Sequence, residues 1–274
     1  MYELRSSFWL CQLYRFVMGC LASELNENML EGSAVIIAPH PDDETLGCGG
    51  TVIRKKHAGA DVKIIFMTDG SHSNNKVLSV DELTVIRVNE ALAATRMLGV
   101  EETALFFLGF EDGRLAQMQE AAVARVAAIL QQQQPEEIFI PYSHDPHPDH
   151  MAAHKIVMAA LQQYQREVVI YEYPIWFWRQ WPWTSVPLHS RRKIVKVLRK
   201  NVIMNARLLN VFKSRVDIEG VLAQKQAALG EHKSQLTQLV PDPRWLTLGD
   251  VANGEFLDCF FQKHEVFHRY YFSS

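Results

Sequence analysis

The side chains best suited to chemistry lie in the segment 38–44, Ala-Pro-His-Pro-Asp-Asp-Glu. It follows the run 34–38, whose length and β-branched content are typical of a buried parallel strand. An imidazole and two carboxylates therefore leave a strand at its carboxyl end, the edge at which open α/β sheets bind ligands. His40 and Asp43 can reach one divalent ion, while Asp42 stays free beside it. A catalytic zinc needs this arrangement of few protein ligands, room for water and a nearby carboxylate base.

A second cluster of similar composition follows the apolar run 138–141. It contains His144, Asp145, His147, Asp149 and His150. Both clusters come directly after expected strands, so a parallel sheet can bring them together although they are far apart in the sequence. The helix expected after the second cluster carries one more histidine, His154. We expect it to support the site or to lie on the helix surface, in preference to being a fourth metal ligand.

Length and composition describe an ordinary globular chain. Its 274 residues suffice for one large α/β domain or two small ones, and 48% hydrophobic and 22% charged residues are usual for a soluble protein. Four cysteines form no CxxC pair, which indicates reduced thiols and a cytoplasmic location. The apolar runs are too short for a transmembrane helix, which needs about 18 residues.

Alternating strand and helix patterns predict an α/β fold with a mostly parallel, Rossmann-like sheet. A sheet order of 3-2-1-4-5 would put the first and fourth strands beside the switch point, and with them the two clusters. Ser79 and Glu82 form a capping box at the start of the second helix. The expected strands are 33–39, 62–67, 104–108, 137–141 and 168–171, and the expected helices are 45–58, 79–98, 115–132 and 149–164.

The two ends of the chain are expected to add to this core. Residues 1–30 are predicted to form an amphipathic helical extension, and 31–274 a single domain. Asp217 is expected to cap a helix that ends at Gly230, and residues 255–272 to close the sheet as one or two edge strands. The polar loop 71–76 is a candidate flap over the substrate.

Residues 173–216 form an aromatic and basic insertion in this plan. They contain ten of the 28 Lys and Arg residues and no acidic residue, which leaves 18 basic against 31 acidic side chains in the rest of the chain. Such a block favours an anionic partner or substrate. Four of the six tryptophans lie between 176 and 183, where packing, a sugar-stacking wall and a membrane-interface patch are all open alternatives.

With both clusters considered, the chain resembles the PIG-L/LmbE-like de-N-acetylases, zinc-dependent hydrolases of N-acetylglucosamine-type sugars. That family is marked by a His-Pro-Asp-Asp-Glu segment after the first strand and a His-Pro-Asp-His segment after the fourth, here 40–44 and 147–150. Segments 87–91 and 224–235 also resemble family helices. The resemblance covers roughly 33–170 and resumes near 217.

The resemblance implies a role for each matching residue. It makes His40, Asp43 and His150 the ligands of Zn²⁺, with Fe²⁺ as an alternative. It further makes Asp42 the general base that takes a proton from a metal-activated water, His147 a cationic group that stabilises the oxyanion and protonates the amine, and Asp149 a residue that orients a histidine.

Structural explanations compete with several of these roles. Asp42 and Asp43 could cap the following helix, and His147 could be a polar loop residue. Arg87 is expected to position substrate, although an ion pair with Glu90 explains it almost as well. Asp112 is a weaker substrate-binding candidate, because it lies in a Glu-Asp-Gly turn.

The expected function is removal of an N-acetyl group from a GlcNAc-type sugar, either a small molecule or a lipid- or nucleotide-linked compound. A metal-dependent phosphoesterase is the main alternative, and a non-catalytic sugar- or membrane-binding protein is the other. The basic block is not accompanied by a nucleic-acid-binding module, so no nucleic-acid partner is expected. Peripheral contact of 173–216 with the inner face of the cytoplasmic membrane, and a homo-oligomer, remain open.

Overall fold

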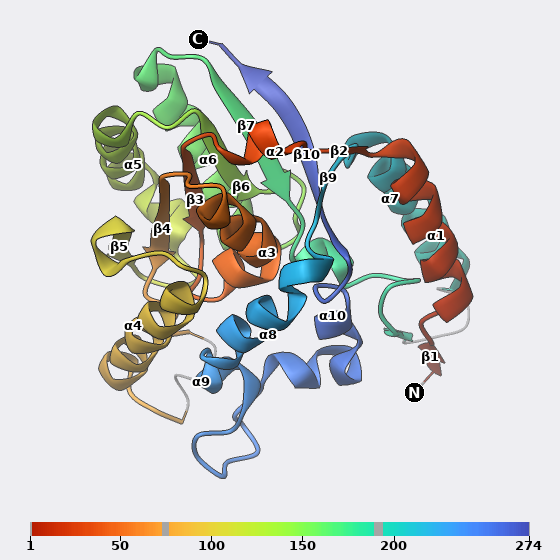
Figure 1. Ribbon diagram of the computed structural model, residues 1–274. Coiled ribbons are helices and arrows are strands. Elements are labelled where there is room, and N and C mark those ends of the chain that lie inside the picture. Colours follow the sequence, from red (N-terminus) through yellow and green to blue (C-terminus); the bar gives the residue numbers. More distant parts are fainter. Residues whose placement is uncertain (1, 73–76, 189–193, 274) are drawn as a thin grey trace.

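The structure is a computed structural model that describes residues 2–72, 77–188 and 194–273. Within these residues the main sheet has eight strands in the order β2-β9-β10-β7-β6-β3-β4-β5, and a small sheet pairs β1 with β8 (Figure 1). The strands are β1 (Tyr2–Leu4), β2 (Ser23–Glu24), β3 (Ala34–Ala38), β4 (Val62–Thr68), β5 (Leu105–Phe110), β6 (Glu137–Pro141), β7 (Val168–Tyr173), β8 (Val186–Leu188), β9 (Ser214–Asp217) and β10 (His264–Phe272).

Helices surround the main sheet (Figure 1). They are α1 (Phe8–Leu21), α2 (Glu27–Leu30), α3 (Asp43–His57), α4 (Val80–Met97), α5 (Gln119–Gln133), α6 (Pro148–Tyr164), α7 (Ile194–Val211), α8 (Leu222–Gly230), α9 (Lys233–Leu236) and α10 (Glu255–Asp258). Three of the short 3₁₀ segments lie in connections near the site: η2 (Leu115–Met118), η3 (Trp176–Trp178) and η6 (Leu248–Gly254).

The five central strands have the predicted parallel arrangement. β3 pairs in parallel with β4 on one side and with β6 on the other. β4 pairs in parallel with β5, and β6 with β7. In chain order this is 3-2-1-4-5, so the expected α/β fold with its Rossmann-like sheet is confirmed. β3 and β6 lie side by side, and the loops that follow them start at the same edge of the sheet.

Both faces of β3 are buried, which explains its unbroken apolar run. Val35 and Ile37 belong to a core under α5 and α6, whereas Ala34, Ile36 and Ala38 belong to the core under α3 and α8. Successive residues of a strand point to opposite faces, so a central strand between two helical layers needs apolar residues at every position.

The remaining strands extend the sheet beyond the predicted order. β10 runs antiparallel between β7 and β9, and β2 is at the edge, parallel to β9. The expectation that residues 255–272 form edge strands was therefore wrong, since β10 is an interior strand and 255–258 is helical. The expectation that Asp217 caps the following helix was also wrong, because α8 begins only at Leu222. Asp217 ends β9 and accepts a hydrogen bond from the backbone N–H of Glu219.

The N-terminal residues are joined to the rest of the chain at several points. β1 pairs with β8, β2 joins the main sheet, and α1 lies beside α7 at one side of the molecule (Figure 1). None of the helices in the described ranges has the length and apolar character needed to cross a bilayer. The Ser79–Glu82 capping box is present at the start of α4, as predicted.

Candidate active site

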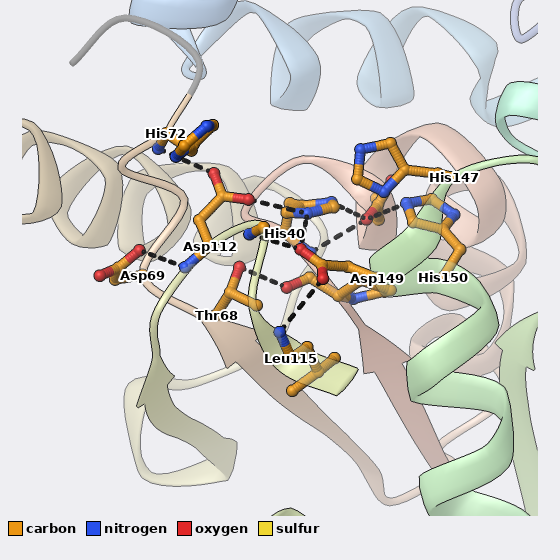
Figure 2. Close-up of polar contacts among 12 residues, drawn as sticks. His40, Thr68, Asp69, His72, Asp112, Leu115, His147, Asp149 and His150 are labelled. Carbon is orange, nitrogen blue, oxygen red and sulfur yellow. Dashed lines mark hydrogen bonds and ion pairs between the residues drawn. The ribbon is translucent and has the colours of Figure 1, made fainter. Parts of the chain in front are cut away.

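Loops after β3 and β6 bring the two polar clusters together. The first loop holds His40 and Asp42 and runs into α3, whose first residue is Asp43. The second loop carries His147 and runs into α6, whose Pro148 start leaves His150 in the first turn. Figure 2 shows His40, Asp149, His147 and His150 pointing toward one another from these elements. The sheet therefore brings the two clusters together as the sequence predicted.

Asp43 lies between the histidines of the two clusters. Its Oδ2 is 3.2 Å from Nδ1 of His40 and 3.2 Å from Nε2 of His150, and it also accepts a hydrogen bond from the backbone N–H of His40 at 3.0 Å. Burial alone would raise the pKa of Asp43, but the charge of His150 and the close contacts with both histidines hold it well below its usual range. The carboxylate is thus ionised and shared by two imidazoles.

Two more carboxylates face the other nitrogen of His40. Nε2 lies 3.2 Å from Oδ1 of Asp112 and 3.3 Å from Oδ2 of Asp149. Asp149 is fixed by backbone N–H groups of Gly113 at 2.7 Å and Leu115 at 3.2 Å, and Asp112 by that of His72 at 2.9 Å. Three carboxylates around one imidazole create a concentrated negative field that favours a cation.

The donor set fits a divalent metal ion. Ligand atoms lie within 4.8 Å of one another in two groups that share His40, one with His147 and His150 and the other with Asp112 and Asp149. Among the described residues, Nδ1 of His147 is buried without a hydrogen-bond partner, and the two buried ring nitrogens of His150 have only the carboxylate oxygens of Asp43 at 3.2 Å and Asp145 at 3.5 Å, neither aligned as a regular hydrogen bond. Buried imidazole nitrogens are costly when unsatisfied, and a metal would satisfy them.

Asp42 is held in an unusual backbone conformation beside these residues. Its φ of 135° is rarely adopted by a residue with a side chain, and its backbone N–H donates to Oε2 of Glu44 at 2.9 Å. Burial and the neighbouring charge of Asp43 raise the pKa of Asp42 to about 7. Asp42 borders the pocket described below and does not cap α3 with its side chain, so the capping alternative is not what the structure shows.

Glu44 and His232 form a buried pair behind Asp42. Nε2 of His232 is 2.9 Å from Oε1 of Glu44, which also accepts from the hydroxyl of Thr45 at 2.6 Å. Both members of the pair are completely buried. The sequence analysis gave neither residue a role, and no local signal could have joined them because they are far apart in the chain.

Asp145 is a second buried residue to which the sequence analysis gave no role. Its Oδ1 is 3.5 Å from Nδ1 of His150 and accepts from the backbone N–H of His147 at 3.3 Å. Its Oδ2 accepts from the backbone N–H groups of Ile175 at 3.0 Å and Phe177 at 3.2 Å. Asp145 therefore ties His147 and His150 to the segment after β7, and its place in the second cluster was the available signal.

His147 is stacked on an aromatic side chain at the pocket wall. Its ring lies 5.7 Å from that of Trp176 at an interplanar angle of 24°, and Trp176 stacks in turn on Phe256 at 5.0 Å. Burial, together with the charges of His40 and His150, lowers the pKa of His147 to about 4. The free imidazole is thus neutral at neutral pH, whereas the resemblance implies a cationic one.

These residues border a pocket of about 450 Å³. One wall carries the candidate metal-binding and acid–base residues, namely His40, Asp42, Asp43, Asp112 and His147. The rest comes from five other places in the chain. They are Leu46 of α3, the loop after β4 (Gly70 and His72), the aromatic segment after β7 (Ile175, Trp176 and Arg179), Gln235 of α9, and the stretch around η6 and α10 (Leu246, Thr247, Leu248, Asp250, Val251, Ala252 and Phe256). His72 belongs to the expected flap, and residues 73–76 of that flap lie outside the described residues.

Arg87 does not border the pocket, and neither do Asp149 and His150 of the predicted site residues. The Arg87 side chain is completely buried in α4, where the charges of Asp42, Glu90 and Asp112 surround it. Burial lowers the pKa of Arg87 in spite of these acidic neighbours. His154 is also not at the centre, because its Nε2 pairs with Oε1 of Glu172 at 2.7 Å.

Similarity to known proteins agrees with this geometry. Residues 35–161 match the family model PIG-L: GlcNAc-PI de-N-acetylase. This segment includes both polar clusters, Arg87 and Asp112, whereas Trp176 and the loop around η6 lie outside it.

Individual proteins that this chain is similar to are deacetylases by name. It is 26% identical to the 1D-myo-inositol 2-acetamido-2-deoxy-alpha-D-glucopyranoside deacetylase of Rhodococcus opacus, over 82% of this chain and 88% of that protein. It is 24% identical to the diacetylchitobiose deacetylase of Thermococcus kodakarensis, over 83% and 79%. The fold is also that of N,N'-diacetylchitobiose deacetylase from Pyrococcus horikoshii, with a TM-score of 0.62 at 21% identity, over 98% of this chain and 95% of that one.

Proposed function

We propose that the chain is a metal-dependent hydrolase that removes the N-acetyl group from an N-acetylglucosamine-type sugar. The position of Asp43 carries this proposal, because its Oδ2 lies 3.2 Å from a ring nitrogen of both His40 and His150, with Asp42 beside it at the pocket. Further support comes from the two relatives, which are named as deacetylases of an acetamido-deoxy-glucopyranoside and of diacetylchitobiose.

We assign His40, Asp43 and His150 as the metal ligands. Two imidazoles and one carboxylate suit Zn²⁺, and they suit Fe²⁺ equally. The ion would polarise the acetyl carbonyl and lower the pKa of a water molecule. Asp149 orients His40 through the 3.3 Å contact between Oδ2 and Nε2, and Asp145 supports His150 from the opposite side.

Asp42 and His147 are the residues that move protons in this proposal. Asp42 borders the pocket next to the ligand Asp43 and accepts the proton of the attacking water. His147 faces the same pocket and stabilises the negative charge that develops on the acetyl oxygen. That charge raises the proton affinity of His147, which takes up a proton from solvent in the open pocket and delivers it to the departing nitrogen as the C–N bond breaks. Asp42 afterwards returns the proton of the water to solvent.

The pocket wall offers contacts for the sugar itself. Trp176 presents an aromatic ring on which a sugar face can stack, and Asp112 can accept hydrogen bonds from hydroxyl groups. We assign Arg87 an indirect part in substrate positioning, because its buried guanidinium balances the charges of Asp42 and Asp112. Of the four clustered tryptophans, Trp178 and Trp183 are buried packing residues, so Trp176 is the best placed for a sugar.

We further propose a sugar with an anionic aglycone, linked to lipid or nucleotide. Arg179 supports this choice, because it borders the pocket with its guanidinium 5.9 Å from the Trp176 ring. Arg191, Arg192 and Lys193 of the basic block lie outside the described residues. The cytoplasm is the proposed compartment, in keeping with four free cysteines.

Phosphoester hydrolysis is the second candidate, and one observation favours it. His40, Asp112 and Asp149 form a second group of ligand atoms that shares His40 with the group of His147 and His150. Because a neutral imidazole ligates one ion, Asp112 and Asp149 would hold a second ion. Two-metal sites are common in phosphatases. Hydrolysis of a phosphate monoester by protein that binds two zinc ions per chain would favour this candidate.

The proposal is tested by acetate release from a panel of free, nucleotide-linked and lipid-linked N-acetylglucosaminides. Zinc-loaded or iron-loaded protein should release acetate from one class, metal-depleted protein should not, and added metal should restore the rate. The class that reacts identifies the aglycone. No acetate from any of them, by protein that holds one ion per chain, would refute the deacetylase proposal.

A further inference from the structure

Helix α1 carries an apolar stripe that the rest of the chain does not cover. Trp9, Leu13 and Phe16 lie one helical turn apart from one another, and Trp9 and Phe16 are 81% and 70% exposed. The opposite face of the helix is covered, since Cys11 and Met18 are buried. An amphipathic surface helix normally places its apolar side inward, so exposed aromatic residues on the outer side call for a partner.

Helix α7, which packs beside α1 (Figure 1), has an exposed apolar stripe of its own. It exposes Val195, Val202 and Ile203, with Val195 74% exposed. These residues share one helical face because their spacing is seven and eight residues. We call the exposed apolar residues of the two helices the α1–α7 face: Trp9, Leu13, Phe16, Val195, Val202 and Ile203.

Positive charge surrounds the α1–α7 face. Helix α7 belongs to the segment 173–216, which has ten Lys and Arg residues and no acidic residue. Arg199 is exposed within the α7 stripe itself. A separate cavity of about 500 Å³ beside α1 is bordered by Arg15, Arg215 and Lys263, and also by Phe16 of the face. Basic side chains therefore lie near both helices, although Lys263 pairs with Glu219 at 2.6 Å and Arg215 with Glu24 at 3.5 Å.

From this surface we infer that the α1–α7 face docks on an anionic lipid bilayer. Helices that lie in the membrane interface have this composition, with aromatic and aliphatic residues inserted and basic residues near the phosphate groups. α1 is only 14 residues long, a length that suits lying in the interface. A second copy of the chain would bring a like-charged surface against this one, which disfavours self-association. Docking is independent of the proposed reaction, because none of the face residues borders the active-site pocket.

Flotation with lipid vesicles tests the inference. The full chain should bind vesicles of phosphatidylcholine with phosphatidylglycerol, bind pure phosphatidylcholine at least tenfold more weakly, and lose most binding in high salt. The double variant Trp9→Ser/Phe16→Ser should bind the anionic vesicles at least tenfold more weakly. Val85→Ser is the matched control, because Val85 is an exposed apolar residue of α4, away from α1 (Figure 1), and should leave binding unchanged.

The melting temperature and the oligomeric state are measured on the same samples. Because Trp9 and Phe16 are exposed, the double variant should keep the melting temperature of the parent chain. Failure of the parent chain to bind anionic vesicles would overturn the inference, as would equal binding by the double variant. A parent dimer that becomes monomeric in the double variant, with no vesicle binding, would assign the face to a second copy.

Discussion

Gly47, in the first turns of α3, has no space for a side chain. An added Cβ would lie 2.3 Å from Cδ2 of Tyr173 and within 2.9 Å of two more ring atoms. The Tyr173 ring is completely buried, and its hydroxyl donates to the carbonyl of Ile37 on β3 at 2.5 Å. The helix that begins with Asp43 can therefore lie close to β3 and β7 only because residue 47 is glycine.

The cost of Gly47→Ala follows from these contacts. The ring must move by about an ångström or more to reach ordinary contact distance, and overpacking of this kind costs about 1–3 kcal/mol. If the movement breaks the hydroxyl contact, the buried carbonyl of Ile37 adds roughly 1–3 kcal/mol. The better helix propensity of alanine returns up to about 1 kcal/mol. We expect a net loss of roughly 2–5 kcal/mol, or a fall in melting temperature of about 5–15 °C.

Urea denaturation and thermal melting of Gly47→Ala would measure this loss. Gly230→Ala is the control, because an added Cβ at that position in α8 meets no atom of the described chain within 4 Å. The control should match the parent chain or exceed it slightly. In a Tyr173→Phe background the penalty of Gly47→Ala should shrink, since the hydroxyl contact is already absent. A Gly47→Ala protein as stable as the parent would refute the argument.

Substitutions in three other parts of the structure give further predictions. Glu44→Ala and His232→Ala should each lower the free energy of unfolding, measured in urea, by about 3–5 kcal/mol. The double variant should lose less than the sum of the two losses, and strict additivity would contradict an interaction between the two residues. Burial alone would raise the pKa of Glu172, but hydrogen bonds from His154 and His268 lower it from 4.5 to about 2. The free energy of unfolding should therefore fall by roughly 3 kcal/mol as the pH is lowered from 4.5 to 2. Glu172→Gln should abolish that fall. Trp176→Ala should raise KM about three- to tenfold while Trp176→Phe stays near the parent value, and an unchanged KM would remove Trp176 from the sugar site.

The sequence predicted those parts of the fold that local patterns encode. β3 was recognisable because burial on both faces requires apolar residues throughout, and α4 because Ser79 and Glu82 cap it reciprocally. The meeting of the two clusters followed from topology, since parallel strands deliver their following loops to one edge. These are short-range rules, and the structure obeys them.

Features that depend on distant partners could not be predicted. β10 is an interior strand because it pairs with both β7 and β9, and nothing in its weak alternation indicates two partners. The complete burial of Arg87, which was predicted to position substrate, could not be foreseen either, because Asp42 and Asp112 approach it from other segments of the chain. Glu44 received no role because its partner His232 comes from the opposite end of the chain.

The most direct test compares metal content and acetate release in the same samples of the parent chain, Asp42→Asn and His150→Ala. Asp42→Asn should retain one metal ion per chain and yet release acetate at least about 100-fold more slowly, because it lacks the proton acceptor. His150→Ala should lose both the metal and the activity. Full activity of metal-loaded Asp42→Asn, or unchanged metal content in His150→Ala, would contradict the proposed centre.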